Sequence, residues 1–408
     1  MIKLGVFGLG RGMYYLQQAE NAGAQITAIC DMDSKKLEDA KKYLAPGGVA
    51  CTDFEEFLKA DMDGAVLCNY YCEHAYFAAR CMEKGIAVLS ETASNVTMAQ
   101  GVALCRAKEK TGAVYMLAEN YPFMRSNLEL KRLYDEGSLG RILYAEGEYN
   151  HPASPHDLNA ITPFPGHWRA HLPRTYYCTH SLAPIMYMTG GIPTTVTAKA
   201  VFAPEVNRGT ARLNSDVAAI MLCDMNDGSL TRITGCSAFG GHGLYYRLSC
   251  LKGTAETLRN DMERVLVRYN EWEKPEGTEA TQATQVYETK WEALGDIAEK
   301  AGHGGGDFWV LWHFVQCLEK NEEPFFDVYR SVAMASVGIL GWRSILEGGV
   351  SYRIPDFRNE EDRKQWENDE LSPFPDKDGK VTLPCCSQPY QYTEEDLKAA
   401  EADWAKCK

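Results

Sequence analysis

The sequence predicts an α/β fold, with an N-terminal domain built on a doubly wound parallel sheet and an α+β domain built on a large, mainly antiparallel sheet. Up to about residue 122, short apolar strands alternate with amphipathic helices, the pattern of a parallel sheet covered on both faces. After a linking helix over residues 126–136, longer strands of alternating polarity follow, which is typical of antiparallel sheets. The 408 residues also exceed the roughly 250–300 at which one core stops growing, so two cores are expected.

The first domain is expected to alternate strands and helices throughout. Strands are predicted at residues 3–7, up to 31, 64–68, 87–90 and 113–118, with helices near 34–44, 53–59, 74–84 and 97–111. Ligands of such sheets bind at the carboxyl ends of the strands. Functional side chains are therefore expected at Asp31, Asn69, Glu91 and Glu119.

The second domain is expected to combine an antiparallel sheet with three covering helices. Strands are predicted at residues 142–149, 194–202, 217–224 and 229–236, with helices near 181–188, 307–318 and 328–347. From about residue 351 the chain turns acidic and proline-bearing, and it lacks a core of its own before a last helix over 393–406. The predicted domains are 1–122, 123–350 and an extension over 351–408 that wraps the body.

Composition favours a protein that acts on small soluble substrates in the cytoplasm. A net charge of -14 and a pI near 5.2 argue against binding to nucleic acid or anionic membranes, which requires basic patches. No apolar run approaches the roughly 20 residues of a membrane span, and a strand that begins at Ile2 leaves no room for a signal peptide. The fourteen cysteines are scattered, as expected for reduced, buried thiols. Cys385-Cys386 lacks a partner pair, so no metal is expected.

The first strand runs directly into a glycine-rich turn, Gly8-Leu-Gly-Arg-Gly12, which is followed by a helix and a second strand that ends at Asp31. Gly8 permits the tight turn, and Gly10 lets backbone amides approach a pyrophosphate at the positive end of the helix. Asp31, about 20 residues further on, stands where an acid binds the ribose hydroxyls. This order predicts a dinucleotide-binding Rossmann unit, although Met13 stands where the third glycine is usual. A plain glycine turn in another α/β domain is the alternative.

The acid at the end of the second strand favours NAD over NADP. A carboxylate at Asp31, with no arginine in residues 31–35, would repel a 2′-phosphate. Asn69 and His74 follow the third predicted strand, where the nicotinamide is expected. Asn120 is also predicted to bind the cofactor, and the alternative is that it is only a turn residue. The residues expected to bind the cofactor from this domain are Gly8, Leu9, Gly10, Arg11, Gly12, Met13, Asp31, Asn69, His74, Glu91 and Asn120.

Over roughly residues 1–350 the chain resembles the glucose-fructose oxidoreductase and inositol dehydrogenase family (Gfo/Idh/MocA). The resemblance is carried by the glycine turn, by Glu91, by Glu119-Asn120 and by Glu136-Gly-Ser-Leu-Gly-Arg-Ile142. It implies a homodimer or homotetramer that assembles through the open sheet of the second domain. The chain departs from the dehydrogenases of the family at two catalytic positions: Thr92 replaces a lysine, and Tyr176 stands where an aspartate precedes His180 by four residues.

These departures resemble a narrower branch, the NAD-dependent glycosidases typified by α-N-acetylgalactosaminidases. Tyr177-Cys-Thr-His180 matches its Tyr-Pro-Thr-His segment, with Cys178 in place of the proline. His167-Trp-Arg169 and His303-Gly-Gly-Gly-Asp-Phe308 match two further segments. The resemblance implies that Trp168 and Arg169 bind the cofactor and that the substrate contacts Glu119, His167, His303 and Asp307.

The chemistry implied by this branch is glycoside cleavage without net oxidation. NAD takes a hydride from C3 of the sugar, the ketone acidifies the C2 proton, loss of that proton expels the group at C1, and water addition and hydride return complete the cycle. Tyr177 and His180, three residues apart where a helix begins, can share one face and act as proton carriers. We assign His180 to the C3 hydroxyl and Tyr177 to C2, with the reverse assignment as the alternative.

Other functions and simpler structural roles stay open from the sequence. A sugar or polyol dehydrogenase, or an oxidoreductase that forms 3-keto-glycosides, would keep the same sites and stop after oxidation. A non-catalytic NAD-binding sensor would need only the cofactor half. The structural alternatives are a helix cap or core hydrogen bond for His180, core packing for Tyr177 and Trp168, an ion pair for Arg169, and helix caps for Glu91 and Asp307.

Overall fold

The computed structural model describes residues 1–276, 279, 283–376 and 378–406 and divides into two compact units. Unit 1 comprises residues 1–132, 288–333 and 356–368, and unit 2 comprises 133–287, 334–355 and 369–408. Residues 288–333, which the sequence placed in the second domain, thus belong to the same compact unit as the N-terminal region. The tail is divided in the same way, with residues 356–368 in unit 1 and the remainder in unit 2.

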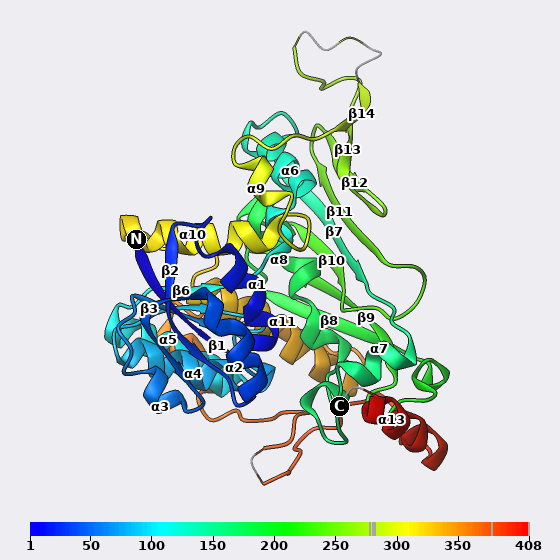
Figure 1. Ribbon diagram of the computed structural model, residues 1–408. Helices are drawn as coiled ribbons and strands as arrows, with labels where there is room; N and C mark the ends of the chain where they lie inside the picture. The colour runs from blue at the N-terminus through cyan, green and yellow to red at the C-terminus, as the bar shows by residue number, and fades with distance from the viewer. Residues whose placement is uncertain (277–278, 280–282, 377, 407–408) are drawn as a thin grey trace. The chain divides into compact units, whose positions relative to one another are not determined.

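Unit 1 contains a six-stranded parallel sheet in the order β3-β2-β1-β4-β5-β6 (Figure 1). The order reverses between β1 and β4, the switch point at which doubly wound sheets bind ligands. This arrangement confirms the predicted N-terminal fold. The strands are β1 (Ile2–Phe7), β2 (Ala24–Cys30), β3 (Leu44–Cys51), β4 (Gly64–Leu67), β5 (Ala87–Ser90) and β6 (Tyr115–Leu117). The connecting helices are α1 (Leu9–Gln18), α2 (Ser34–Ala40), η1 (Lys41–Tyr43), α3 (Phe54–Phe57), η2 (Tyr71–Glu73), α4 (His74–Glu83) and α5 (Met98–Thr111).

The inner strands of this sheet are apolar on both faces, since helices cover both sides. Val6, Val66 and Leu89 are fully buried. The outermost strand, β3, was not predicted from the sequence because it contains Pro46 and two glycines. Only an edge strand tolerates such residues, because one of its sides carries no ladder of hydrogen bonds.

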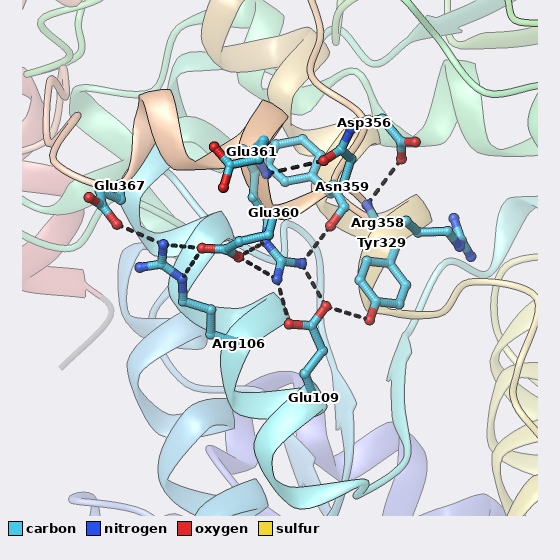
Figure 2. A network of polar contacts seen from close by, with 11 residues as sticks. Arg106, Glu109, Tyr329, Asp356, Arg358, Asn359, Glu360, Glu361 and Glu367 are labelled. Carbon is cyan, nitrogen blue, oxygen red and sulfur yellow. Dashed lines mark hydrogen bonds and ion pairs between the residues drawn. The ribbon is translucent and has the colours of Figure 1, made fainter.

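The later segments of unit 1 attach to the Rossmann core through helices and ion pairs. Figure 2 shows how residues 356–368 bind α5, where Arg106 pairs with Glu360 and Glu367. From α11, the Tyr329 hydroxyl donates a hydrogen bond to Glu109 at 2.9 Å. The elements of these segments are η3 (Tyr121–Phe123), α6 (Arg125–Asp135), α9 (Gly295–Ala298), α10 (Gly306–Lys320), α11 (Val328–Leu346), α12 (Glu360–Arg363) and η8 (Lys364–Trp366), of which α6 and α11 continue into unit 2.

Unit 2 contains a nine-stranded sheet in the order β14-β13-β12-β11-β7-β10-β9-β8-β15, which confirms the predicted α+β architecture. β7 and β10 pair in parallel, whereas β11 with β7, β11 with β12, β12 with β13, β10 with β9, and β9 with β8 pair antiparallel. The strands are β7 (Ile142–Asn150), β8 (Thr195–Phe202), β9 (Asp216–Asp224), β10 (Leu230–Thr234), β11 (Gly243–Cys250), β12 (Gly253–Leu258), β13 (Asp261–Tyr269), β14 (Thr284–Glu288) and β15 (Tyr352–Arg353).

Helix α8 (Thr179–Thr189) packs against this sheet at very short range. A Cβ atom at Gly147 of β7 would lie 2.0 Å from the backbone oxygen of Ser181, so only glycine fits there. The last helix, α13 (Glu394–Lys406), docks on α7 (Pro155–Ala160), where the indole of Trp404 donates to the carbonyl of Thr162 at 2.8 Å. The remaining short helices are η4 (Trp168–Ala170), η5 (Arg174–Tyr177) and η6 (Pro204–Asn207).

Candidate functional site

The glycine turn has three glycines with three different physical roles. Gly8 has φ +91°, and a Cβ atom there would lie 2.4 Å from the backbone of Cys68. At Gly12, a Cβ atom would lie 2.6 Å from a methyl group of Val6, so glycine is needed for α1 to pack on β1. At Gly10, the nearest atom would be the Lys36 ammonium at 3.9 Å, which leaves the backbone open to a ligand and places a cation nearby. This surface fits a pyrophosphate.

Asp31 ends β2 as predicted, and its buried carboxylate holds the turn. One oxygen accepts a hydrogen bond from the Leu9 amide at 2.6 Å, and the other accepts from the Asp33 amide at 2.9 Å. Asp31 is therefore a positioning group for the turn as well as the predicted ribose ligand. Met13, the last of the predicted cofactor contacts on α1, is partly exposed.

Asn69 and His74 lie at the carboxyl end of β4, next to the turn. The imidazole of His74 lies between the carbonyl of Ala93 at 3.0 Å and that of Asn69 at 3.2 Å. Burial lowers the pKa of His74, so the ring is neutral at pH 7. The side-chain oxygen of Asn69 is buried and has no hydrogen-bond partner among the described residues, which leaves it available to a bound group. These features fit the predicted dinucleotide.

Arg11, in the same turn, forms ion pairs with two carboxylates from distant parts of unit 1. Its Nε donates to Glu91 at 2.8 Å, and its terminal nitrogens donate to the two oxygens of Asp307 at 3.0 and 2.5 Å. The hydroxyl of Tyr15 donates to the same oxygen of Glu91 at 2.7 Å. Tyr15 was not predicted from the sequence, and only its helical spacing of four from Arg11 could have indicated it.

Two predicted residues complete the environment of Asp307. The amide of Asn120 donates to one carboxylate oxygen at 2.8 Å, and Nδ1 of His303 lies 2.9 Å from the other. Burial alone would raise the pKa of Asp307, but hydrogen bonds from His303 and Arg11 outweigh it and hold this pKa well below its usual value. Burial likewise opposes the ionisation of Glu91, yet the Arg11 charge keeps its pKa lowered. Both carboxylates are therefore ionised at neutral pH.

The predicted substrate residues of unit 1 differ in how accessible they are to a ligand. Asp307 is 1% exposed and both of its oxygens are held by protein groups, so it positions Arg11 and His303. Glu119 has no exposed surface. Of this predicted set, His303 retains a partly exposed ring.

In unit 2, the structure brings together the two predicted proton carriers. Tyr177 ends η5 and His180 lies in the first turn of α8, and their ring centroids are 5.1 Å apart in an edge-on arrangement. Tyr149 of β7 contacts both rings, with its centroid 5.0 Å from that of His180. The Tyr246 hydroxyl donates to the carbonyl of His180 at 2.6 Å and fixes the start of the helix.

The segment His167-Trp-Arg169 forms η4. His167 is buried, and its Nδ1 accepts a hydrogen bond from the Arg169 amide at 3.3 Å. The Arg169 guanidinium stacks over the Trp168 ring, with its central carbon 4.4 Å from the ring centroid, which is a cation–π contact. Burial, together with the charges of Arg169 and Arg212, lowers the pKa of His167 to about 4, so this ring is neutral at pH 7.

A cavity of about 120 Å³ opens beside Tyr177 within unit 2. Two of its lining residues, Tyr177 and Arg169, were predicted as site residues from the sequence, whereas Arg174 and Arg212 were not. These residues come from separate loops, and no spacing in the sequence connects them. Other lining residues are Tyr149, His151 and Cys236.

In the part of the chain that the structure describes, every cysteine is a free thiol. The same residues include no group of three or more His, Cys, Asp and Glu side chains arranged to hold a metal ion. None of the described helices is both long enough and apolar enough to span a membrane.

Comparison with known families identifies the architecture. Residues 2–119 match the oxidoreductase family with an NAD-binding Rossmann fold, and residues 127–256 match the GFO/IDH/MocA C-terminal domain. The chain belongs to the Gfo/Idh/MocA family. Its cofactor is accordingly NAD, in agreement with the glycine turn and Asp31. Residues 242–367 of this Gfo/Idh/MocA chain also match the C-terminal domain of glycosyl hydrolase 109.

Curated relatives of this chain are also named as members of glycosyl hydrolase family 109. Glycosyl hydrolase family 109 protein 1 from Shewanella sp. (strain MR-4) is 25% identical over 402 residues, which cover 88% of this chain and 85% of the relative. A glycosyl hydrolase family 109 protein from Shewanella pealeana is 25% identical over 394 residues, with coverage of 87% and 85%.

Solved structures of Gfo/Idh/MocA type share the fold at low identity. Levoglucosan dehydrogenase in complex with NADH superimposes with a TM-score of 0.69 at 15% identity, covering 87% of this chain and 99% of that one. Myo-inositol 2-dehydrogenase from Lactobacillus plantarum gives a TM-score of 0.66 at 17% identity, with coverage of 86% and 99%. An oxidoreductase from Agrobacterium radiobacter in complex with NAD+, L-tartaric acid and magnesium gives 0.67 at 16%, with coverage of 86% and 98%.

Proposed function

We propose that the protein is an NAD-dependent glycosidase that cleaves sugars by transient oxidation at C3, elimination across C2 and C1, and re-reduction. The observation that carries this proposal is the pairing of Tyr177 with His180, because two adjacent proton carriers are what oxidation followed by elimination requires. The similarity to glycosyl hydrolase 109 supports the same chemistry.

The chain's own residues divide the work between the two units. In unit 1, the glycine turn and Asp31 hold the dinucleotide, and the ionised pair of Glu91 and Asp307 fixes Arg11. When bound, NAD supplies a reversible hydride acceptor. In unit 2, His180 accepts the proton of the C3 hydroxyl and Tyr177 accepts the proton at C2, with exchanged roles as the alternative. Loss of the C2 proton expels the group at C1. Water then adds to C1 of the sugar.

A sugar dehydrogenase is the second candidate function. The named dehydrogenases among the similar structures favour it, whereas Thr92 in place of the family's lysine and Tyr176 in place of its aspartate count against it. Tyr176 is 3% exposed and packs against Phe374, and burial raises the pKa of its hydroxyl, so it does not supply the ionised carboxylate of the family's aspartate. A sensor without catalysis would have no use for the paired Tyr177 and His180.

The deciding experiment follows isotopes and NADH during turnover of a panel of nitrophenyl glycosides in deuterated water. We expect solvent deuterium at C2 of the released sugar, slower cleavage of C2- and C3-deuterated substrates, and no accumulation of NADH. NADH that rises in step with product would show a dehydrogenase, and neither signal would show a sensor. Normal cleavage after complete removal of NAD would contradict the proposal.

Two variants test the assigned residues directly. His180→Ala and Tyr177→Phe should each lower kcat by about 100-fold or more, as is usual for general acid–base groups, with unchanged NAD affinity. His156→Ala is the matched control, because the His156 side chain is 58% exposed and lies outside the cavity. Rates of the first two variants within about threefold of wild type would reject the assignment.

We further propose that the protein assembles as a homodimer or homotetramer through the open face of the unit 2 sheet. Leu143, Leu222 and Leu230 from three neighbouring strands are about two-fifths exposed on this sheet. Exposed apolar side chains in such number favour coverage by a partner. Light scattering at micromolar concentration should show two or four chains, and a monomer would contradict this proposal.

A further inference from the structure

Three arginines from three separate segments of unit 2 line one cavity. Arg169 lies in η4, Arg174 begins η5, and Arg212 precedes β9. Cys236 lines the same cavity; burial raises the pKa of its thiol, and the charges of all three arginines act in the opposite direction. Tyr177 lines the same cavity.

No carboxylate side chain of the described residues is bonded to this cluster. Arg212 is 5% exposed and its Nε makes no hydrogen bond within the described residues. The Nε of Arg174 donates to the backbone oxygen of Asp216 at 2.8 Å, while the carboxylate of Asp216 accepts hydrogen bonds from the amide and hydroxyl of Ser387. Arg169 stacks on an indole ring.

Another buried arginine of unit 2, Arg343, is paired with a carboxylate. Arg343, 7% exposed, forms two hydrogen bonds with the carboxylate of Asp369. Burial lowers the pKa of Arg212 to about 9, and repulsion from the charges of Arg174 and Arg169 adds to this effect. Arg212 therefore stays protonated at pH 7, and no carboxylate of the described residues is bonded to it. A buried cation without a counter-charge costs several kcal/mol, so folding alone gives no reason for it.

The cavity has room for the missing counter-charge. Its volume of about 120 Å³ is several times the ~10–15 Å³ that one water needs. Guanidinium groups bind carboxylates, sulfates and phosphates through paired, charge-assisted hydrogen bonds. We propose that this cavity binds an oxyanion carried by the sugar substrate, either the carboxylate of a uronic acid or a sulfate or phosphate ester. The claim that the anion is part of a sugar rests on the proposed function, because it uses Tyr177 as the neighbouring reactive group.

The experiment compares nitrophenyl glycosides that differ only at C6, with the NAD-loaded protein. The neutral hydroxymethyl sugar is set against its carboxylate, sulfate ester and phosphate ester, so that the arms separate the three sources of the anion. We expect kcat/KM for one anionic member to exceed that of its neutral parent by about 100-fold, the effect of two charge-assisted hydrogen bonds. Arg212→Gln should reduce this ratio by about 30-fold, and Arg212→Lys by less, since it keeps the charge. Arg264→Gln, at an exposed ion pair, is the control that should leave the ratio unchanged.

Calorimetry with free sugar acids separates failure of this inference from failure of the proposed function. Binding of glucuronate or galacturonate that depends on Arg212, without cleavage of any glycoside, would reject the glycosidase and sustain the anion site. Cleavage with equal kcat/KM for neutral and anionic members would sustain the glycosidase and reject the anion site. Inorganic sulfate that binds as tightly as the sugar acids would overturn the assignment to substrate. So would an Arg212→Gln variant that loses NAD affinity but keeps its preference among sugars, because the cluster would then serve the cofactor.

Discussion

In unit 1 the guanidinium of Arg11 contacts two carboxylates, whereas in unit 2 Arg212 shares one cavity with two other arginines, whose charges lower its pKa. Both side chains are largely buried, so both have lost much of their hydration. Arg11 recovers the loss through Glu91 and Asp307, which are held ionised by it. For Arg212, no described carboxylate makes up this loss. The first arrangement stabilises the fold, and the second leaves charge for a ligand to neutralise.

The largest expected effect comes from breaking the compensated pair. Arg11→Met should lower the free energy of unfolding by about 3–5 kcal/mol, because it leaves two buried carboxylates without their cation. Urea denaturation of the cofactor-free protein measures this. Arg80→Met is the control: Arg80 pairs with Glu55, which is 56% exposed, and its loss should cost under about 1 kcal/mol. Equal losses in the two variants would contradict the comparison.

A second prediction separates stability from cofactor binding in the turn that carries Arg11. Gly8→Ala should destabilise the protein by roughly 2–3 kcal/mol, because of its positive φ and the overlap with Cys68. Gly10→Ala should leave stability unchanged or slightly raised, since the site is helical and open. Its methyl group should nevertheless weaken NAD binding by about tenfold or more by keeping the pyrophosphate from the backbone. Thermal unfolding and NAD titration decide between these outcomes, and unchanged NAD affinity in Gly10→Ala would contradict the proposed pyrophosphate position.

A third prediction uses pH to report on the uncompensated charge. His167 lies within range of Arg169 and Arg212 and has a folded pKa of about 4, below its unfolded value near 6.5. Between these values the unfolded chain binds more protons, so stability should fall by about 1–3 kcal/mol as pH drops from 6.5 to 4. His167→Gln should flatten this slope. A bound sugar acid should raise the pKa of His167, as NMR titration of the ring would show, and an unshifted pKa would argue against an anion in the cavity.

The smallest expected effect is on stability at Arg212. Arg212→Met should unfold at the same temperature as wild type or a higher one, because it removes a buried charge that no described carboxylate neutralises. The contrast with Arg11→Met is the sharpest form of the comparison. A loss of more than about 2 kcal/mol would mean that Arg212 is structural.

The sequence determined the features that depend on neighbouring residues along the chain. The alternation of apolar strands and amphipathic helices gave the correct fold class, and the glycine turn followed by Asp31 gave the correct cofactor. Helical spacing brought Tyr177 and His180 together in the prediction, and their rings are in contact range in the structure. In each case the geometry is local, since turn, helix and strand are fixed by residues within about 20 positions of one another.

Tertiary structure alone decided which distant side chains meet. Asp307, expected to touch the sugar, lies beside Arg11, 296 positions away in the chain. Arg174 and Arg212 join Arg169 at one cavity although no motif links them. The strand β3 forms despite Pro46 because it has a sheet edge to occupy. Burial and the fields of neighbouring charges set whether a cation is neutralised by the protein or left for a ligand, and these depend on packing that no local pattern records.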